Sequence, residues 1–252
     1  VAKIETQEAI ENIDAIIAAT DAIMVARGDL AVEVGPEKVP NYQKMIIKKC
    51  NEAGKPVIVA TQMLESMISS PVPTRAEVSD VANAIFDGAD AVMLSEESAL
   101  GSYAKEAVTM MTHIATQVEG EIGTHRRLKV HSNDIVDSVS SSVVHNAEDV
   151  KAKLIVALTE TGSTPRMIAR YKPQQPVIVL TPHEHVARQS QLVFGCYPLL
   201  TKSFSGSTQL INTIGPLLIK NGLGKKSDRI VVSAGVPFGT PGTTNMLMIL
   251  TM

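Results

Sequence analysis

A lysine and two carboxylates lie at the ends of two apolar segments near the start of the chain. Lys3 and Glu5 belong to the segment 1–5, and Asp29 follows the segment 22–26. Carboxylates are the ligands that a hard cation such as Mg²⁺ prefers, with substrate oxygens and waters completing its coordination. A lysine beside that cation can neutralise a phosphoryl group, because catalysis of phosphoryl transfer depends mainly on positioning and electrostatics. We therefore expect part of a site for a metal ion and a phosphorylated anion.

The tetrapeptide Arg27–Leu30 is expected to turn a strand into a short helix. Gly28 allows the backbone to approach a ligand, and the first N–H groups of a helix attract a carboxylate or a phosphate. The alternative is a plain tight turn with an acidic N-cap. Thr61 and Gln62 follow another apolar run, so a hydroxyl and an amide can orient a substrate or relay a proton. The alternative for Thr61 is helix capping.

The first half of the chain alternates strand-like and helix-like segments, which indicates a parallel sheet with crossover helices. The expected strands are 1–5, 22–26, 56–61 and 91–94, and the expected helices are 7–19, 39–53, 75–87 and 104–119. The strands are continuously apolar, and polar residues follow each of them. In a βα barrel this rim, at the carboxyl ends of the strands, is where active sites are built.

Glycine and charged residues interrupt the pattern over 120–127 and predict a domain boundary there. A second βα region follows. Its expected helices are 135–150, 166–171 and 185–192, and its expected strands are 154–158, 177–180, 230–233 and 246–250. We therefore predict an α/β chain: half of a TIM (β/α)8 barrel over 1–122, then a separate α/β domain with a mostly parallel sheet over 123–252.

Two loops of the second region are candidate anion sites. The loop 159–165 follows a strand, is rich in hydroxyls and opens a helix with Pro165, whereas the loop 238–244 is rich in glycine, proline and threonine. Helix capping and a hairpin turn are the respective alternatives. The lysine and spacing of a nucleotide P-loop are missing. The candidate residues are Thr159, Thr161, Gly162, Ser163, Thr164, Gly239, Thr240 and Gly242.

Composition restricts the classes of partner. The 252 residues are 44% hydrophobic and carry a net charge of −3, with no basic stripe for nucleic acid and no apolar run long enough to span a membrane. We expect a cytoplasmic protein. Cys50 and Cys196 are distant in sequence, which favours two reduced, buried thiols. The chain starts without Met inside a strand-like segment, so we expect it to be a piece of a longer protein.

Five motifs, in order, carry a close resemblance to the pyruvate kinase family. They are Val1–Glu5, Ile23–Leu30, Ala60–Met67, Pro73–Glu77 and Asp80–Ala84. The resemblance extends from what corresponds to the fifth barrel strand through the eighth, and more weakly through the C-terminal domain. The first four strands and the lid domain of the family are missing. The implied reaction transfers a phosphoryl group from phosphoenolpyruvate to ADP and yields pyruvate and ATP.

The resemblance also implies roles for individual residues. Lys3 would stabilise the transferring phosphoryl group, and Glu5 and Asp29 would bind Mg²⁺ or Mn²⁺. The substrate carboxylate would bind the backbone of Ala26, Arg27, Gly28 and Asp29 together with Thr61, which would also lie near the face where the enolate is protonated. A K⁺ ion is implied, with ligands outside this chain.

Further implications concern regulation and assembly. The loops at 159–164 and 239–242 match where many members of the family bind a sugar-phosphate effector. The whole protein would be a homo-oligomer, a tetramer in the family. Two segments depart from the family pattern: residues 95–98 read Ser-Glu-Glu-Ser where glycine and threonine are common, and Glu160–Thr161 stands in a loop often richer in lysine and serine. These departures bear on the effector and leave the core of the active site intact.

Two other functions stay open at this point. The chain could be a non-catalytic effector-binding or oligomerisation fragment whose working part is the second domain. It could also be a metal-dependent pyruvate aldolase, since carboxylate-bound metals stabilise pyruvate enolates. An aldolase has no need for Lys3 beside the metal, so a requirement for a phosphoryl donor discriminates the two enzymes. Half of a barrel exposes apolar strand edges, so we expect the isolated chain not to be a stable monomer.

Overall fold

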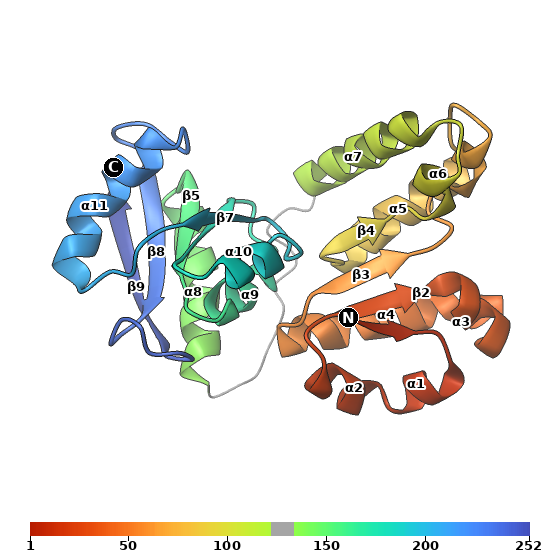
Figure 1. The fold of residues 1–252 in the computed structure, drawn as a ribbon, viewed down its shortest axis with the longest axis horizontal. Coiled ribbons are helices and arrows are strands. Elements are labelled where there is room, and N and C mark those ends of the chain that lie inside the picture. The colour runs from red at the N-terminus through yellow and green to blue at the C-terminus, as the bar shows by residue number, and fades with distance from the viewer. Residues whose placement is uncertain (122–133) are drawn as a thin grey trace. The chain divides into compact units, whose positions relative to one another are not determined.

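The computed structural model describes residues 1–121 and 134–252, which form two compact units, Val1–His125 and Arg126–Met252 (Figure 1). Each unit has its own sheet and its own buried core. The boundary predicted between residues 122 and 123 falls outside the described residues. We describe the units separately.

The first unit is built on a four-stranded parallel sheet in the order β1 (Ala2–Ile4), β2 (Ile23–Ala26), β3 (Val57–Ala60) and β4 (Ala91–Met93). One face carries the buried residues Ile23, Val25, Val57 and Val59, which belong to the same core as the helices. The register places Lys3, Met24, Ile58 and Ala91 in one row on the opposite face. Helices on one face and a second inward-facing row are what half of a βα barrel requires, so the predicted fold class is confirmed.

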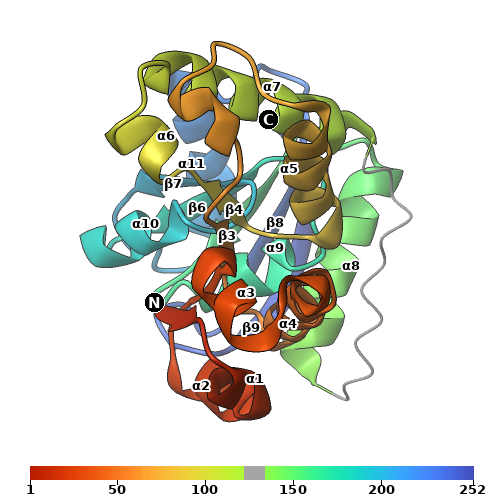
Figure 2. The ribbon, with the colours of Figure 1, turned by 90° about the vertical axis from the view of Figure 1, so that its right-hand side faces the viewer.

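The helices of this unit follow the strands closely. They are α1 (Gln7–Glu11), α2 (Ile13–Ala19), α3 (Arg27–Val34), α4 (Val39–Ala53), α5 (Arg75–Asp87), α6 (Glu96–Ala99) and α7 (Ala104–Glu121), with 3-10 turns η1 (Pro36–Lys38) and η2 (Glu65–Ile68). The prediction of one helix over 7–19 was wrong, because the chain breaks at Asn12, whose side-chain amide donates to the Glu8 carbonyl at 2.9 Å. Helices α3 and α4 lie side by side (Figures 1 and 2).

The start of α5 combines a helix cap with a tertiary contact. Thr74 and Glu77 form a capping box, in which the Glu77 N–H donates to Thr74 Oγ1 and the Glu77 carboxylate accepts from the Thr74 N–H at 2.7 Å. The same carboxylate also accepts hydrogen bonds from the backbone and hydroxyl of Ser66, at 2.7 and 2.6 Å. One side chain thus ties the segment after β3 to α5.

Glu77 makes the stability of this contact depend on pH. Burial favours a higher pKa for Glu77, but the hydrogen bonds from Ser66 and Thr74 outweigh it and lower the pKa below its ordinary value. Because the folded pKa is depressed, the stabilisation is present at neutral pH and is lost as the pH falls through the folded pKa. We expect Glu77→Gln to lower the Tm at pH 7 and to have a smaller effect at pH 3. A Tm difference independent of pH would contradict this.

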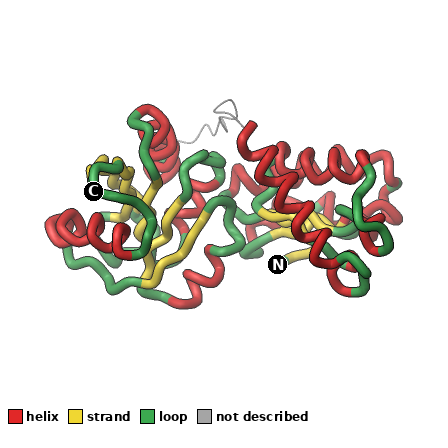
Figure 3. Tube along the Cα trace, turned by 90° about the horizontal axis from the view of Figure 1, so that it is seen from above, coloured by secondary structure: helices red, strands yellow, loops and turns green. Residues whose placement is uncertain are grey.

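The second unit is built on a five-stranded sheet in the order β7-β6-β5-β8-β9 (yellow strands in Figure 3). Its strands are β5 (Leu154–Leu158), β6 (Val177–Thr181), β7 (Cys196–Leu200), β8 (Arg229–Gly235) and β9 (Thr244–Thr251), and only β9 is antiparallel to its neighbour. Its helices are α8 (Ile135–Asp149), α9 (Ser163–Ala169), α10 (Glu184–Ser190) and α11 (Ser207–Lys220). The predicted mostly parallel sheet is confirmed.

Both faces of the second sheet are covered by apolar side chains. One core contains residues of α8 and α9, and the other contains Leu210, Ile214 and Leu218 of α11. Strands β5 and β8 are neighbours, and the chain leaves β5 toward β6 but leaves β8 toward β9, on the opposite side. Such a switch point in an α/β sheet is where ligands bind. Cys50 and Cys196 are both buried, as predicted. Within the described ranges, no helix is long and apolar enough to cross a membrane.

Candidate functional site

The carboxyl ends of β1 and β2 bring the predicted lysine and carboxylates together. Lys3 lies within β1 itself, and Glu5 follows that strand directly. The Lys3 ammonium forms an ion pair with Glu5 Oε1, and their side chains are 56% and 30% exposed. Asp29 lies in the first turn of α3, after β2.

The charges at this rim influence one another. The pKa of Lys3 is raised above its ordinary value, first by its hydrogen bond to Glu5 and then by the charge of Glu5, while burial acts in the opposite direction. The charge of Asp29 raises it further. Lys3 is therefore a cation throughout the neutral pH range, and it shares one site with both carboxylates.

The donor set fits a divalent cation that completes its coordination elsewhere. Glu5 and Asp29 offer carboxylate oxygens on neighbouring strand ends. The described residues contain no group of three or more His, Cys, Asp or Glu side chains that could hold a metal ion by themselves. One or two carboxylates plus substrate oxygens and waters is the usual arrangement for Mg²⁺ at a phosphoryl-transfer site.

The first turn of α3 meets the segment after β3 at the same rim. Ala26 is the N-cap residue and has no side chain that can cap the helix. Thr61 supplies the cap instead, since its Oγ1 accepts the Gly28 N–H at 2.9 Å and donates to the Ala60 carbonyl at 2.6 Å. A Cβ on Gly28 would lie 3.7 Å from Thr61 Oγ1, an ordinary contact, so packing alone does not require glycine there.

Thr61 and Gln62 adopt a backbone conformation that their side chains disfavour. Their φ angles are +67° and +53°, in the left-handed region that glycine populates most easily. Each such residue costs about 1–3 kcal/mol and persists only where the surroundings impose it, most often at functional sites. The strain therefore lies beside the hydroxyl that was predicted to orient the substrate.

A buried acid near this rim was missed by the site prediction. Glu97 in α6 is 2% exposed, and its carboxylate accepts the Leu64 N–H at 3.0 Å and the Ser95 N–H at 2.7 Å. It links the segment after β3 to the segment after β4. The sequence signal for this residue was the pair Glu96–Glu97 directly after an apolar strand, but the residue types alone do not show which of the two acids is buried.

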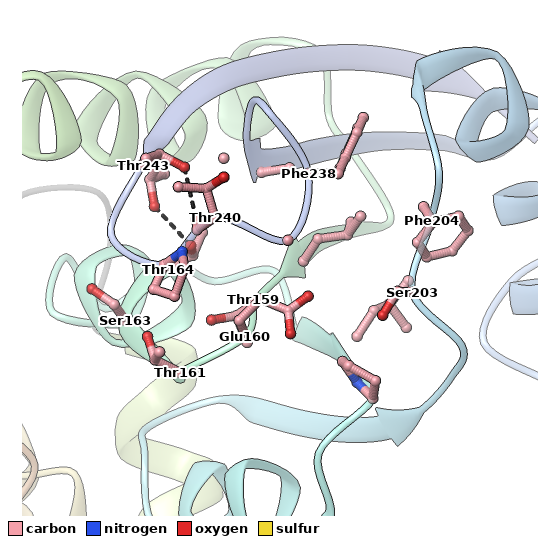
Figure 4. Close-up of a pocket in the computed structure, with 18 of the residues that line it drawn as sticks. Thr159, Glu160, Thr161, Ser163, Thr164, Ser203, Phe204, Phe238, Thr240 and Thr243 are labelled. Carbon is pink, nitrogen blue, oxygen red and sulfur yellow. Dashed lines mark hydrogen bonds between the residues drawn. The ribbon is translucent and has the colours of Figure 1, made fainter.

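The predicted anion-binding loops of the second unit line one pocket. It is formed by the segments that follow β5 and β8, together with residues 201–204. Hydroxyl side chains of Thr161, Ser163, Thr164 and Thr240 gather toward one end, and Phe204 lies at the other (Figure 4). The structure thus brings together the two loops that the sequence singled out.

Internal hydrogen bonds hold the loops of this pocket in place. Thr164 Oγ1 and Thr244 Oγ1 are 2.7 Å apart and join the two loops. Gly162 has a φ of +80°, which suits glycine, and its N–H donates to Thr159 Oγ1 at 2.9 Å. The charged residues at the pocket are Lys202 and Glu160, and the Glu160 carboxylate is 2.7 Å from His183 Nε2.

Comparison with known proteins identifies the family. Residues 1–108 match the model of the pyruvate kinase barrel domain, and residues 137–250 match that of the pyruvate kinase alpha/beta domain. The chain belongs to the pyruvate kinase family. The half-barrel and the second α/β unit are thus two domains of this family.

Individual relatives agree over almost the whole chain. The chain is 50% identical to a pyruvate kinase of Clostridium acetobutylicum over 251 residues, which is 98% of the chain and 53% of that relative. It is 48% identical to a pyruvate kinase of Staphylococcus haemolyticus, covering 97% of the chain and 42% of the relative. The crystal structure of a Cryptosporidium parvum pyruvate kinase matches with a TM-score of 0.89 at 40% identity, over 99% of this chain and 50% of that one. The chain spans about half the length of these relatives.

Proposed function

We propose that this chain supplies the phosphoryl-transfer residues of a pyruvate kinase, which converts phosphoenolpyruvate and ADP into pyruvate and ATP. The observation that carries the proposal is the ion pair of Lys3 with Glu5, at a strand end where the charge of Asp29 in the first turn of α3 also acts on Lys3. A lone pair of carboxylates would serve a metal-dependent aldolase equally well. The cation of Lys3 favours chemistry on a phosphoryl group. The matching relatives support this choice, and a cytoplasmic location fits it.

The residues would divide the reaction between them. Glu5 and Asp29 would hold Mg²⁺, or Mn²⁺, which supplies Lewis-acid neutralisation of phosphoryl and enolate oxygens. The first turn of α3 would bind the substrate carboxylate, with Thr61 fixing the position of the Gly28 N–H. Lys3 would neutralise charge on the phosphoryl group while its bond to the enol oxygen breaks and a bond to the terminal oxygen of ADP forms. The enolate then takes a proton at its methylene carbon, near Thr61.

The test of this function is pyruvate formation from phosphoenolpyruvate and ADP in the presence of Mg²⁺ and K⁺. It is run on this chain alone and on this chain fused behind the preceding residues of the Clostridium acetobutylicum relative, which completes the barrel. We expect turnover that depends on ADP and Mg²⁺ in the fusion. Cleavage of a hydroxy acid to pyruvate without a phosphoryl donor would support an aldolase instead.

The pocket of the second unit supports a second role, the binding of a sugar-phosphate effector. Its hydroxyl-lined end and Lys202 suit a phosphate group, and its position at the carboxyl end of β5 is where α/β sheets bind ligands. This role would also belong to a non-catalytic fragment. In the whole protein, which we propose to be a homotetramer, the effector would act on the active site.

Charge in this pocket should control the binding of phosphate esters. We expect Lys202→Met to weaken binding of fructose 1,6-bisphosphate to this chain by about threefold to tenfold, because one attractive charge is lost. Glu160→Gln should strengthen binding, because a carboxylate beside the anion is removed. Isothermal titration measures both, and Lys226→Met is the control for an exposed lysine outside the pocket lining. Equal affinities in all variants would place the effector elsewhere.

A further inference from the structure

The side chain of Arg27 contacts the segment that follows β3. Arg27 is 8% exposed, although it is the first residue of α3, where the predicted site uses only its backbone. Its guanidinium donates to the carbonyl of Thr61 at 2.7 Å and to those of Ala60 and Gln62 at 3.3 and 3.4 Å. A single buried cation thus binds three successive carbonyl oxygens.

The carbonyls of Thr61 and Gln62 belong to the strained segment at the rim, and that of Ala60 ends β3. Thr61 and Gln62 are both left-handed, and such a conformation persists only where contacts impose it. The guanidinium is well suited to impose it, because its five N–H donors have a fixed planar geometry. A lysine offers a point charge on a flexible stem and cannot reproduce three divergent contacts.

Arg27 and Gly28 contact the same threonine from two directions. The Arg27 side chain binds the backbone of Thr61, and the Gly28 backbone donates to the side chain of Thr61. The two adjacent residues therefore fix both the main chain and the hydroxyl of Thr61 against the first turn of α3. A change at the guanidinium must reach this hydroxyl.

Two acidic residues complete the arrangement. Asp80 in α5 pairs with Arg27 Nη1 at 2.5 Å and balances its charge. Glu97 accepts the Leu64 N–H at the far end of the segment. The segment 61–64 is therefore held by a cation at the carbonyls of Thr61 and Gln62 and by an anion at its last N–H.

We propose that Arg27 is a positioning residue for substrate binding: its guanidinium holds the backbone of Thr61 so that the Thr61 hydroxyl caps the first turn of α3 and keeps the N–H groups of that turn in place for the substrate carboxylate. This rests on the proposed function. It predicts that the loss of the guanidinium releases the segment 61–64 and weakens binding of the substrate carboxylate. Binding of the metal at Glu5 and Asp29 is not affected.

The test compares the fusion that completes the barrel with its Arg27→Lys variant in three measurements. Hydrogen exchange without ligand should be about tenfold faster for the amides of residues 61–64. The Kd for phosphoenolpyruvate in the presence of Mn²⁺ should rise about tenfold. The Kd for Mn²⁺ alone should stay within about twofold. If the role of Arg27 were merely structural, the substitution would instead lower the Tm and weaken the binding of phosphoenolpyruvate and Mn²⁺ together.

Two further variants make the outcome decisive. Lys44→Met removes a different ion pair, which joins Lys44 of α4 to Asp87 of α5. It should change neither the amide exchange of residues 61–64 nor the affinity for phosphoenolpyruvate. Asp80→Asn leaves the guanidinium in place and should give a smaller increase in exchange, so it decides the matter if Arg27→Lys fails to fold. If Arg27→Lys folds and the amides of residues 61–64 exchange no faster in it, the inference is overturned. If Arg27→Lys does not fold, unchanged exchange of these amides in Asp80→Asn overturns it.

The same measurements separate this inference from the proposed function. If the unsubstituted fusion binds Mn²⁺ but no phosphoenolpyruvate, the proposed function fails, and the substrate-positioning role fails with it. If it binds phosphoenolpyruvate and Arg27→Lys binds it equally well, only the role of Arg27 is overturned. Faster exchange of the amides of residues 61–64 in Arg27→Lys, together with a selective loss of phosphoenolpyruvate binding, supports both the proposed function and the role of Arg27.

Discussion

Replacing Lys3 with methionine is expected to reduce pyruvate formation by the completed barrel by at least about 10³-fold, because the variant loses the cation that would neutralise the transferring phosphoryl group. Methionine keeps the length of the side chain and removes only its charge and hydrogen bonds. The fusion behind the Clostridium acetobutylicum residues provides the assay, with pyruvate measured at saturating phosphoenolpyruvate and ADP.

The metal affinity of the Lys3→Met variant provides the control. Lys3 is paired with Glu5, so it competes with a divalent cation for that carboxylate. Its removal should leave Mn²⁺ binding intact or make it tighter, as titrated by electron paramagnetic resonance. Activity within about tenfold of the unsubstituted protein would exclude Lys3 from the chemistry. Loss of both activity and Mn²⁺ binding would point to a damaged fold.

The substitution Glu5→Gln is expected to weaken Mn²⁺ binding by about 10- to 100-fold. Glu5 is one of the two carboxylates at the rim, and an amide is a neutral and weaker ligand for a hard cation. Because Lys3 also loses its partner, the local charge becomes more positive, which opposes cation binding further. Pyruvate formation should fall at least as much as metal affinity at subsaturating Mg²⁺.

Glu8→Gln is the matched control for Glu5→Gln. Glu8 is an exposed acid in α1, three residues along the chain, and its replacement changes the net charge equally. Mn²⁺ binding in this variant should stay within about twofold. If both variants weaken Mn²⁺ binding equally, the effect comes from the change in net charge, and Glu5 is not a ligand.

The sequence predicted those elements whose local signals agree with their tertiary environment. The helices 39–53 and 75–87 were predicted to the residue, since the first follows a proline turn and the second starts with a capping box. Strand β7 was missed because Pro198 within it argues against a strand. Helix α11 was missed because Gly215 and Pro216 interrupt its pattern.

The composition of the rim was predictable, but its supporting contacts were not. Lys3, Glu5 and Asp29 were singled out because polar residues at parallel strand ends meet at one edge. The left-handed conformation of Thr61 was not visible, because a positive φ at a β-branched residue is imposed by contacts from elsewhere in the fold. The buried side chains of Arg27 and Glu97 that make those contacts come from α3 and α6.

Strand β1 has a consequence for when the site can work. It has three residues, carries Lys3 and, among the described residues, pairs only with β2, so one edge of it is open. A short strand supported on one side has little to restrain it. Any strand that pairs with this open edge would restrict the motion of Lys3 relative to Glu5 and Asp29. Pairing along this edge would therefore fix the position of the lysine that we propose to act on the phosphoryl group.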